Sequence, residues 1–252
     1  MMFDRSVFVR PVAHRGLHGH ASDAIENTAV AFAAGLDRGY GIECDLQPAS
    51  DDTPMVFHDD TLDRLMEATG RIDALTPRQL EALNYRGRSD RILTFADLLE
   101  LAAGRGPLLV EIKSDWRPPR EAFLKKIAAL CTRYKGPLAL MSFDPVVMAA
   151  VATLVPRIPR GIVSGVYVGA EWEVDKLGLE RAARLTDLLE SRAAAPSFYA
   201  YDVKRLPTPV TRYIREVQGL PLFTWTVRTA ADRATAAAWA DASIFESSAE
   251  DG

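Results

Sequence analysis

The sequence is poor in cysteine and lacks an excess of positive charge. Cys44 and Cys131 are the only cysteines among 252 residues, and both lie in apolar runs, so we expect buried, reduced thiols and no disulfide framework. The 30 Lys and Arg residues are outnumbered by 34 Asp and Glu residues, which gives a net charge of −4. Because nucleic-acid-binding proteins usually present a basic face, this balance argues against a nucleic-acid partner.

A long, uninterrupted apolar run is also missing. The longest apolar stretch, residues 137–155, is interrupted by Asp144 and Pro145, which favours a strand followed by a helix over a membrane span. Asp4 and Arg5 stand where a secretory signal would need an unbroken apolar core. We therefore expect no membrane span and a cytoplasmic location.

Short apolar runs alternate with helical patterns along the whole chain, which is typical of βαβ units on a parallel sheet. The length of 252 residues fits one large domain, and α/β barrels often have this size. Strands are expected at residues 11–14, 40–44, 53–58, 107–112, 137–143, 160–164, 198–203, 221–227 and 242–246. Helices are expected at residues 26–37, 94–103, 119–134, 145–154, 176–193, 208–217 and 229–240.

Nine strands are one more than a (β/α)8 barrel holds, and the surplus strand can be located. Only 12 residues separate Asp45 from His58, whereas a parallel crossover needs about a dozen residues or more and usually a helix. A hairpin that turns at 51–53 forms more easily and places His58 roughly opposite Asp45. We therefore predict an α/β fold, a (β/α)8 TIM barrel in a single domain at 1–252, with an insertion at about 46–92 after the second strand.

Two short stretches of sequence, VAHRG and IECDLQPASDDTPMVFHDD, combine residue types that suit phosphodiester cleavage. His14 and His58 can each exchange a proton near neutral pH. Arg15 is a permanent cation whose geometry suits phosphate oxygens. Glu43 and Asp45 are one residue apart on a predicted strand, so both point to the same face, and a hard divalent cation prefers such oxygen ligands. The pattern predicts two proton carriers, a phosphate ligand and a metal site.

Further polar and aromatic residues end other predicted strands, and functional residues of parallel barrels lie at the carboxyl ends of the strands. Glu111 and Lys113 share one face of the LLVEIK strand, where they could instead form a buried ion pair. Ser142 and Phe143 end the next strand. Trp225 lies on the FTWTV strand, either in the core or against a substrate pocket.

Loop residues near the predicted rim allow simpler explanations. His18 and His20 lie in a glycine-rich polar loop and are expected to be exposed to solvent. Trp116 and Trp172 lie in predicted rim loops, where each could contact a head group or merely cap the core. Asp59 is more simply a turn residue than a metal ligand.

These pieces resemble the glycerophosphodiester phosphodiesterase family, barrel phosphodiesterases related to phosphatidylinositol-specific phospholipase C. The matching pieces, in chain order, are AHRG, IENT, IECD, VFHDDTLDRL, VEIK, MSF and FTWTV. They run from residue 12 to residue 227, and their order is as informative as their content. The resemblance implies metal-dependent hydrolysis of a small-molecule glycerophosphodiester to glycerol 3-phosphate and an alcohol.

The resemblance also assigns roles to residues of this chain. The implied acid–base pair is His14 and His58. The implied ligands of a divalent cation, Mg2+ or Ca2+, are Glu43, Asp45 and Glu111. The implied phosphate-binding residues are Arg15 and Lys113, and Phe143 and Trp225 are candidates for the wall of the substrate pocket.

The sequence departs from the family pattern where head groups would be recognised. Ile25 replaces a usual proline, the segment 65–67 replaces a threonine-rich continuation, and the last strand reads SIFESS where many relatives have Ile-Thr-Asp. The chain stops soon afterwards, so a full eighth helix is not expected. The reaction type is therefore better founded than the head-group specificity.

Two alternatives stay open at this point. The first is a lysophospholipase D-type enzyme, which would need an apolar approach to the site, for example along Leu62, Leu65 and Met66. The second is a non-catalytic barrel that binds phosphodiesters or lipid head groups. That alternative would require the loss of a proton carrier or a ligand, and none of those residues is missing.

Overall fold

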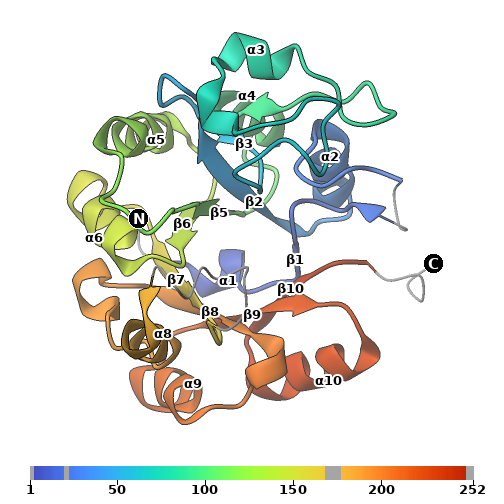
Figure 1. The fold of residues 1–252 in the computed structure, drawn as a ribbon. Coiled ribbons are helices and arrows are strands. Elements are labelled where there is room, and N and C mark those ends of the chain that lie inside the picture. Colours follow the sequence, from blue (N-terminus) through green and yellow to red (C-terminus); the bar gives the residue numbers. More distant parts are fainter. Residues whose placement is uncertain (1–2, 20–22, 168–176, 248–252) are drawn as a thin grey trace.

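The computed structural model describes residues 3–19, 23–167 and 177–247. Eight parallel strands form a closed ring, with helices on its outside (Figure 1). Their order around the ring is β1-β2-β5-β6-β7-β8-β9-β10, and β10 pairs with β1 to close it. The predicted (β/α)8 barrel is confirmed.

The elements follow the predicted alternation of strand and helix. The barrel strands are β1 (Val12–Ala13), β2 (Gly41–Pro48), β5 (Leu108–Ile112), β6 (Leu138–Ser142), β7 (Arg160–Ser164), β8 (Phe198–Asp202), β9 (Leu222–Val227) and β10 (Ala242–Phe245). The helices between them are α2 (Ala29–Asp37), α4 (Phe95–Ala102), α5 (Glu121–Arg133), α6 (Pro145–Leu154), α8 (Leu179–Thr186), α9 (Pro209–Tyr213) and α10 (Ala230–Trp239). The expectation about an eighth helix falls on residues 248–252, outside the described residues.

Three predicted helices have different boundaries. The helix expected at 208–217 consists of α9 and a π-helical turn, η6 (Ile214–Gln218). The helix expected at 26–37 begins only at Ala29, because Asn27 has a positive φ of 58° and Thr28 caps the helix through its side chain. The helix expected at 176–193 consists of α8 and a separate 3-10 turn, η4 (Ser191–Ala194). Leu188 lies between them with φ at 58°, a left-handed conformation that no α-helix can include.

The surplus strand is the hairpin partner of β2. β3 (Pro54–Val56) pairs antiparallel with β2, and the N–H of Phe57 donates to the carbonyl of Asp45 at 3.1 Å. β4 (Leu93–Thr94) continues antiparallel to β3 before α4 begins. The predicted hairpin is confirmed, and it explains why β2 runs to Pro48, past the predicted end at residue 44.

The segment between β3 and β4 has its own small apolar cluster. It includes the short helix α3 (Pro77–Glu81) and the 3-10 turn η2 (Ile72–Ala74). The fully buried side chains of this cluster include those of Leu62 and Met66. They therefore offer no apolar surface to solvent, which removes two of the three residues proposed for an apolar approach.

The amino-terminal segment fills the end of the barrel at which the strands begin. The helix α1 (Arg5–Phe8) lies within the ring of strands in Figure 1. The rings of Phe3 and Phe8 stack at 4.8 Å, and the ring of Phe3 lies 5.1 Å from that of Phe198. This end is apolar, so the polar side chains of the barrel interior face the carboxyl ends of the strands.

Arg160 begins β7 and is a buried cation that caps three carbonyls. Its guanidinium donates to the carbonyls of Ala194 at 3.0 Å, Pro156 at 3.1 Å and Ile158 at 2.9 Å. Burial lowers the pKa of Arg160, but these three acceptors remain matched to its donors.

Replacing Arg160 with methionine should destabilise the barrel. Arg160→Met leaves three carbonyls without a donor, so we expect a loss of about 2–4 kcal/mol in the free energy of unfolding. Urea titration measures this loss. Arg192→Met on η4, where the side chain is exposed, is the matched control and should change stability by less than about 0.5 kcal/mol. Equal losses for both variants would contradict the assignment.

None of the helices in the described part of the chain is long and apolar enough to cross a membrane.

Candidate active site

The predicted site residues gather at the carboxyl ends of the barrel strands. A cavity of about 730 Å3 opens there. Its lining includes all of the predicted site residues except Asp45, namely His14, Arg15, Glu43, His58, Glu111, Lys113, Phe143 and Trp225. Asp45 is buried and forms ion pairs with two of them, Arg15 and Lys113. The fold therefore joins residues that lie far apart in the sequence.

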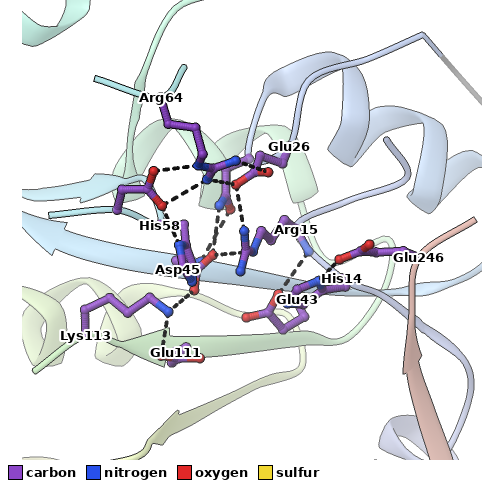
Figure 2. A network of polar contacts seen from close by, with 12 residues as sticks. His14, Arg15, Glu26, Glu43, Asp45, His58, Arg64, Glu111, Lys113 and Glu246 are labelled. Carbon is purple, nitrogen blue, oxygen red and sulfur yellow. Dashed lines mark hydrogen bonds and ion pairs between the residues drawn. The ribbon is translucent and has the colours of Figure 1, made fainter. Parts of the chain in front are cut away.

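Three buried carboxylates form the centre of the site (Figure 2). Glu43 and Asp45 point to the same face of β2, and Asp45 is paired in register with Glu111 on β5. One oxygen from each of the three lies within 4.8 Å of the other two. This is a donor set that a divalent cation could occupy.

Two cations partly neutralise this cluster. The Lys113 ammonium lies 2.8 Å from both Asp45 Oδ1 and Glu111 Oε1, so the ion pair considered from the sequence is present. The Arg15 guanidinium lies 3.4 Å from Asp45 Oδ2. Burial raises the pKa of Asp45, but Lys113 and the other neighbouring cations hold it well below its usual value.

Glu43 is the carboxylate that the cations neutralise least. It accepts a hydrogen bond from the backbone N–H of Arg15 at 2.9 Å. Burial first, and then the charges of Asp45 and Glu111, raise the pKa of Glu43 well above its usual value. The cluster thus carries more acidic groups than its own cations neutralise, and a divalent cation fits this surplus.

A tight turn after β1 positions Arg15. Arg15 and Gly16 have φ of 54° and 81°, and a Cβ at Gly16 would lie 2.8 Å from the backbone of Ala31. Only glycine satisfies both constraints, which explains the glycine of the AHRG piece. Asn27 then donates to Asp45 Oδ2 at 2.9 Å and ties the loop to the carboxylate cluster.

His14 is held by a carboxylate from the opposite end of the chain. Its Nδ1 lies 2.7 Å from Glu246 Oε1, and its Nε2 lies 3.9 Å from Glu43 Oε2. Burial lowers the pKa of His14 to about 4, although the hydrogen bond with Glu246 opposes this shift. Arg228 in turn binds both oxygens of Glu246, at 2.6 and 2.7 Å.

His58 has an equivalent arrangement within the insertion. Its Nδ1 lies 2.7 Å from Asp59 Oδ1, and Arg64 donates to both oxygens of Asp59, at 2.6 and 2.9 Å. Arg64 also donates to both oxygens of Glu26, which accepts a further hydrogen bond from Arg15 at 2.7 Å. Asp59 thus does more than form a turn.

An aromatic wall faces the polar groups. The rings of Phe143 and Trp225 meet edge to face at 5.2 Å. Trp116 lines the same cavity, and its ring lies 6.0 Å from that of Tyr167. Both predicted pocket residues therefore face the cavity, whereas Trp172 lies outside the described residues.

His18 does not have the expected exposure. It is half-buried near His14 and Glu246, burial lowers its pKa, and Ser247 Oγ donates to its carbonyl at 3.0 Å. His14, His18 and Glu246 bring potential ligand atoms together, but Arg228 already binds both oxygens of Glu246. We therefore assign no ion to this second group. His20 lies outside the described residues.

The sequence analysis missed Glu246, Arg228 and Arg64. A signal was present for the first two, because each directly follows an apolar strand, as the other rim residues do. Arg64 lies 38 residues from Glu26, and no local pattern links them.

Comparison with known proteins tests the resemblance. The glycerophosphoryl diester phosphodiesterase family matches residues 14–245. The chain belongs to this family.

Curated relatives of the family match parts of the chain. Human glycerophosphodiester phosphodiesterase 1 is 39% identical over 87 residues, which cover 32% of this chain and 25% of that protein. A glycerophosphodiester phosphodiesterase of Caldanaerobacter subterraneus is 32% identical over 111 residues, 41% of this chain and 44% of that protein. The chain therefore spans less than half the length of these curated relatives.

Solved structures of similar fold cover nearly the whole chain. A phosphodiesterase of Oleispira antarctica in complex with the product sn-glycerol-3-phosphate has a TM-score of 0.73 and 19% identity, over 94% of this chain and 92% of that chain. The glycerophosphodiester phosphodiesterase of Thermotoga maritima has a TM-score of 0.70 and 19% identity, over 94% and 93%. At 19% sequence identity, these two structures show that the fold is shared and nothing more.

Proposed function

We propose that this chain hydrolyses glycerophosphodiesters to glycerol 3-phosphate and an alcohol, with a divalent cation such as Mg2+ or Ca2+. The observation that carries this proposal is the cluster of three buried carboxylates between two histidines, each held through Nδ1 by a carboxylate. Family membership and the product in the Oleispira antarctica structure support the same substrate class. The whole of residues 1–252 would act as one barrel domain with its insertion at about 46–92.

Glu43, Asp45 and Glu111 would hold the cation. When bound, the cation neutralises charge on the phosphodiester and lowers the pKa of a coordinated hydroxyl. Lys113 contacts two of these carboxylates at 2.8 Å, so its ammonium would shift toward the phosphate oxygens as the cation binds. Arg15 would bind a phosphate oxygen from the other side, where its guanidinium is already held by Glu26.

His14 and His58 would move the protons of the reaction. Both use Nδ1 to contact a carboxylate, which leaves Nε2 of each ring for the substrate. One Nε2 would accept the proton of the attacking hydroxyl, and the other would donate a proton to the departing alcohol. Phe143 and Trp225 would pack against the carbon atoms of the glycerol.

The alternatives have less support. For a lysophospholipase D-type enzyme, the expected apolar approach is weakened because Leu62 and Met66 are buried. For a non-catalytic barrel, the cavity would have to lack a proton carrier or a ligand. All of the proposed proton carriers and ligands are present in the chain, and the expected cytoplasmic location stays a prediction.

A product assay tests the proposal. Purified protein is incubated with glycerophosphocholine, glycerophosphoethanolamine, glycerophosphoglycerol, glycerophosphoinositol and lysophosphatidylcholine, each with Mg2+, Mn2+ or Ca2+. Released glycerol 3-phosphate is measured with a coupled dehydrogenase. We expect release from at least one of the four glycerophosphodiesters. Lysophosphatidic acid released from the lysolipid, without glycerol 3-phosphate from the others, would favour the lysophospholipase alternative, and no product at all would contradict the enzyme.

Phe143→Ala should weaken substrate binding more than turnover. In the proposed complex Phe143 covers carbon atoms of the glycerol, and each buried CH2 group contributes about 0.8 kcal/mol, so we expect KM to rise about 4- to 15-fold for one or two such groups. Steady-state kinetics on the best substrate measures this change. Tyr213→Ala, an exposed aromatic on α9, is the matched control and should leave KM unchanged. A fall in kcat at constant KM would argue against a pocket-wall role.

A further inference from the structure

Three strand ends meet at Glu246. The backbone N–H of His14, after β1, donates to the carbonyl of Phe245 at 2.9 Å, and the N–H of Glu246 donates to the carbonyl of Val227 on β9 at 3.1 Å. The position of Glu246 is thus fixed where the barrel closes between β9, β10 and β1. Its carboxylate points at His14, 232 residues away in the chain (Figure 2).

This carboxylate contacts two partners in the described part of the chain. Oε1 accepts from His14 Nδ1 and from the Arg228 guanidinium, both at 2.7 Å, and Oε2 accepts from Arg228 Nε at 2.6 Å. Although burial raises the pKa of Glu246, these hydrogen bonds hold it well below its usual value. Glu246 is therefore an acceptor toward the histidine.

An acceptor at Nδ1 fixes the tautomer of the ring. A neutral imidazole carries one proton, so a proton held on Nδ1 leaves the lone pair on Nε2. In His14 the Nε2 atom points into the site, toward Glu43. A neutral His14 can then accept a proton only at the atom that faces the cavity, and the carboxylate stabilises the imidazolium that results.

We propose that Glu246, held by Arg228, is a positioning residue that keeps the proton of His14 on Nδ1 and directs Nε2 to the substrate. The inference rests on the proposed function, in which His14 transfers a proton. The arrangement at His58, with Asp59 and Arg64, has the same order of contacts. It is built within seven consecutive residues, whereas the His14 arrangement exists only because the barrel closes.

Glu246→Gln is the direct test. The glutamine keeps the size of the side chain but is neutral, and its amide can also donate to Nδ1 and favour the other tautomer. We expect kcat to fall about 10- to 100-fold with little change in KM, and the melting temperature to stay near that of the wild type. Glu246→Asp and Arg228→Lys keep charge and should retain more activity than Glu246→Gln and Arg228→Met.

A matched control separates this effect from the loss of an ordinary ion pair. Arg212 binds both oxygens of Glu216 at 2.9 and 3.1 Å on the surface, with no histidine attached. Glu216→Gln should leave kcat and KM unchanged. Equal losses in Glu246→Gln and Glu216→Gln would overturn the proposal.

Two further measurements make the outcome decisive. In a His14→Ala background, Glu246→Gln should cost nothing more, because a positioning residue acts through the side chain that it positions. A full additional loss would assign Glu246 a different role. If His14→Ala is itself fully active, the proposed proton-transfer role of His14 fails, and this inference fails with it. If only Glu246→Gln is fully active, this inference alone fails.

Nitrogen NMR reads the tautomer without any substrate. The chain has four histidines, so the ring resonances of His14 can be identified by their absence from His14→Ala. With 15N-labelled histidine, the neutral His14 ring of the wild type should carry its proton on Nδ1. The Nε2-protonated form should appear in Glu246→Gln, and an unchanged tautomer in that variant would overturn the inference.

Discussion

Exhaustive chelation is expected to reduce glycerophosphodiester hydrolysis by about a thousandfold, and Mg2+, Mn2+ or Ca2+ should restore it. The reason is the surplus of buried acid at Glu43, Asp45 and Glu111, which Lys113 and Arg15 neutralise only in part. A metal ion contributes several kcal/mol of charge stabilisation in the transition state, and about 4 kcal/mol corresponds to a thousandfold in rate.

A pair of variants makes this prediction specific. Glu111→Gln removes one oxygen donor of the cluster, whereas Asp60→Asn removes an exposed carboxylate at the rim of the same cavity, where it pairs with Arg71. Added cation should raise the stability of the wild type and of Asp60→Asn, by about 2.7 kcal/mol at a hundred times Kd, and raise that of Glu111→Gln much less. Full activity of protein in which elemental analysis finds no metal would reject the cation.

The barrel was predictable because its signals are local. A buried parallel strand needs a short apolar run and a covering helix needs a longer amphipathic one, and both are visible in one sequence. The hairpin between β2 and β3 followed from the short connection, because 12 residues without a helical pattern form a hairpin more easily than a parallel crossover. The helix boundary at Leu188 was not predictable, because leucine rarely adopts a left-handed backbone. Asparagine adopts it more often, but the residue type alone did not place the boundary after Asn27.

The site residues could be predicted where they belong to short sequence motifs. Alternation along β2 placed Glu43 and Asp45 on one face, and the pairing of β2 with β5 added Glu111. Contacts between side chains that only the tertiary structure brings together could not be predicted. No pattern in the sequence connects His14 with Glu246, or shows that Lys113 contacts Asp45 on the neighbouring strand in addition to Glu111.

The insertion does more than lengthen the connection after β2. It supplies His58, Asp59 and Arg64, and Arg64 joins the insertion to Glu26 on the first loop of the barrel (Figure 2). Glu26 in turn holds Arg15. The proposed proton carrier His58 and the proposed phosphate ligand Arg15 are therefore linked through Asp59, Arg64 and Glu26, so a change at Glu26 would disturb both.

His14→Ala and His58→Ala should each lower kcat by about two to four orders of magnitude. The Nδ1 of each imidazole contacts a carboxylate, and in the proposed function the Nε2 of one ring accepts a proton while that of the other donates one, so the loss of either ring removes a step. Bound metal should stay near the wild-type amount, because the proposed ligands are all carboxylates. His18→Ala, which removes a half-buried histidine beside the site, is the matched control and should retain most of the activity.

Leaving-group chemistry then separates the two roles. A p-nitrophenyl phosphodiester has an acidic leaving group that departs without a proton, so it should rescue the variant that lost the general acid and not the variant that lost the base. His58 is more exposed than His14, with 31% against 11% of its side chain open to solvent, yet each has a carboxylate that would stabilise the protonated ring. Exposure therefore does not decide between them, and the rescue pattern does. If both variants cleave glycerophosphodiesters at wild-type rates, the assignment of the acid–base pair is wrong. Another residue of the barrel must then carry the protons.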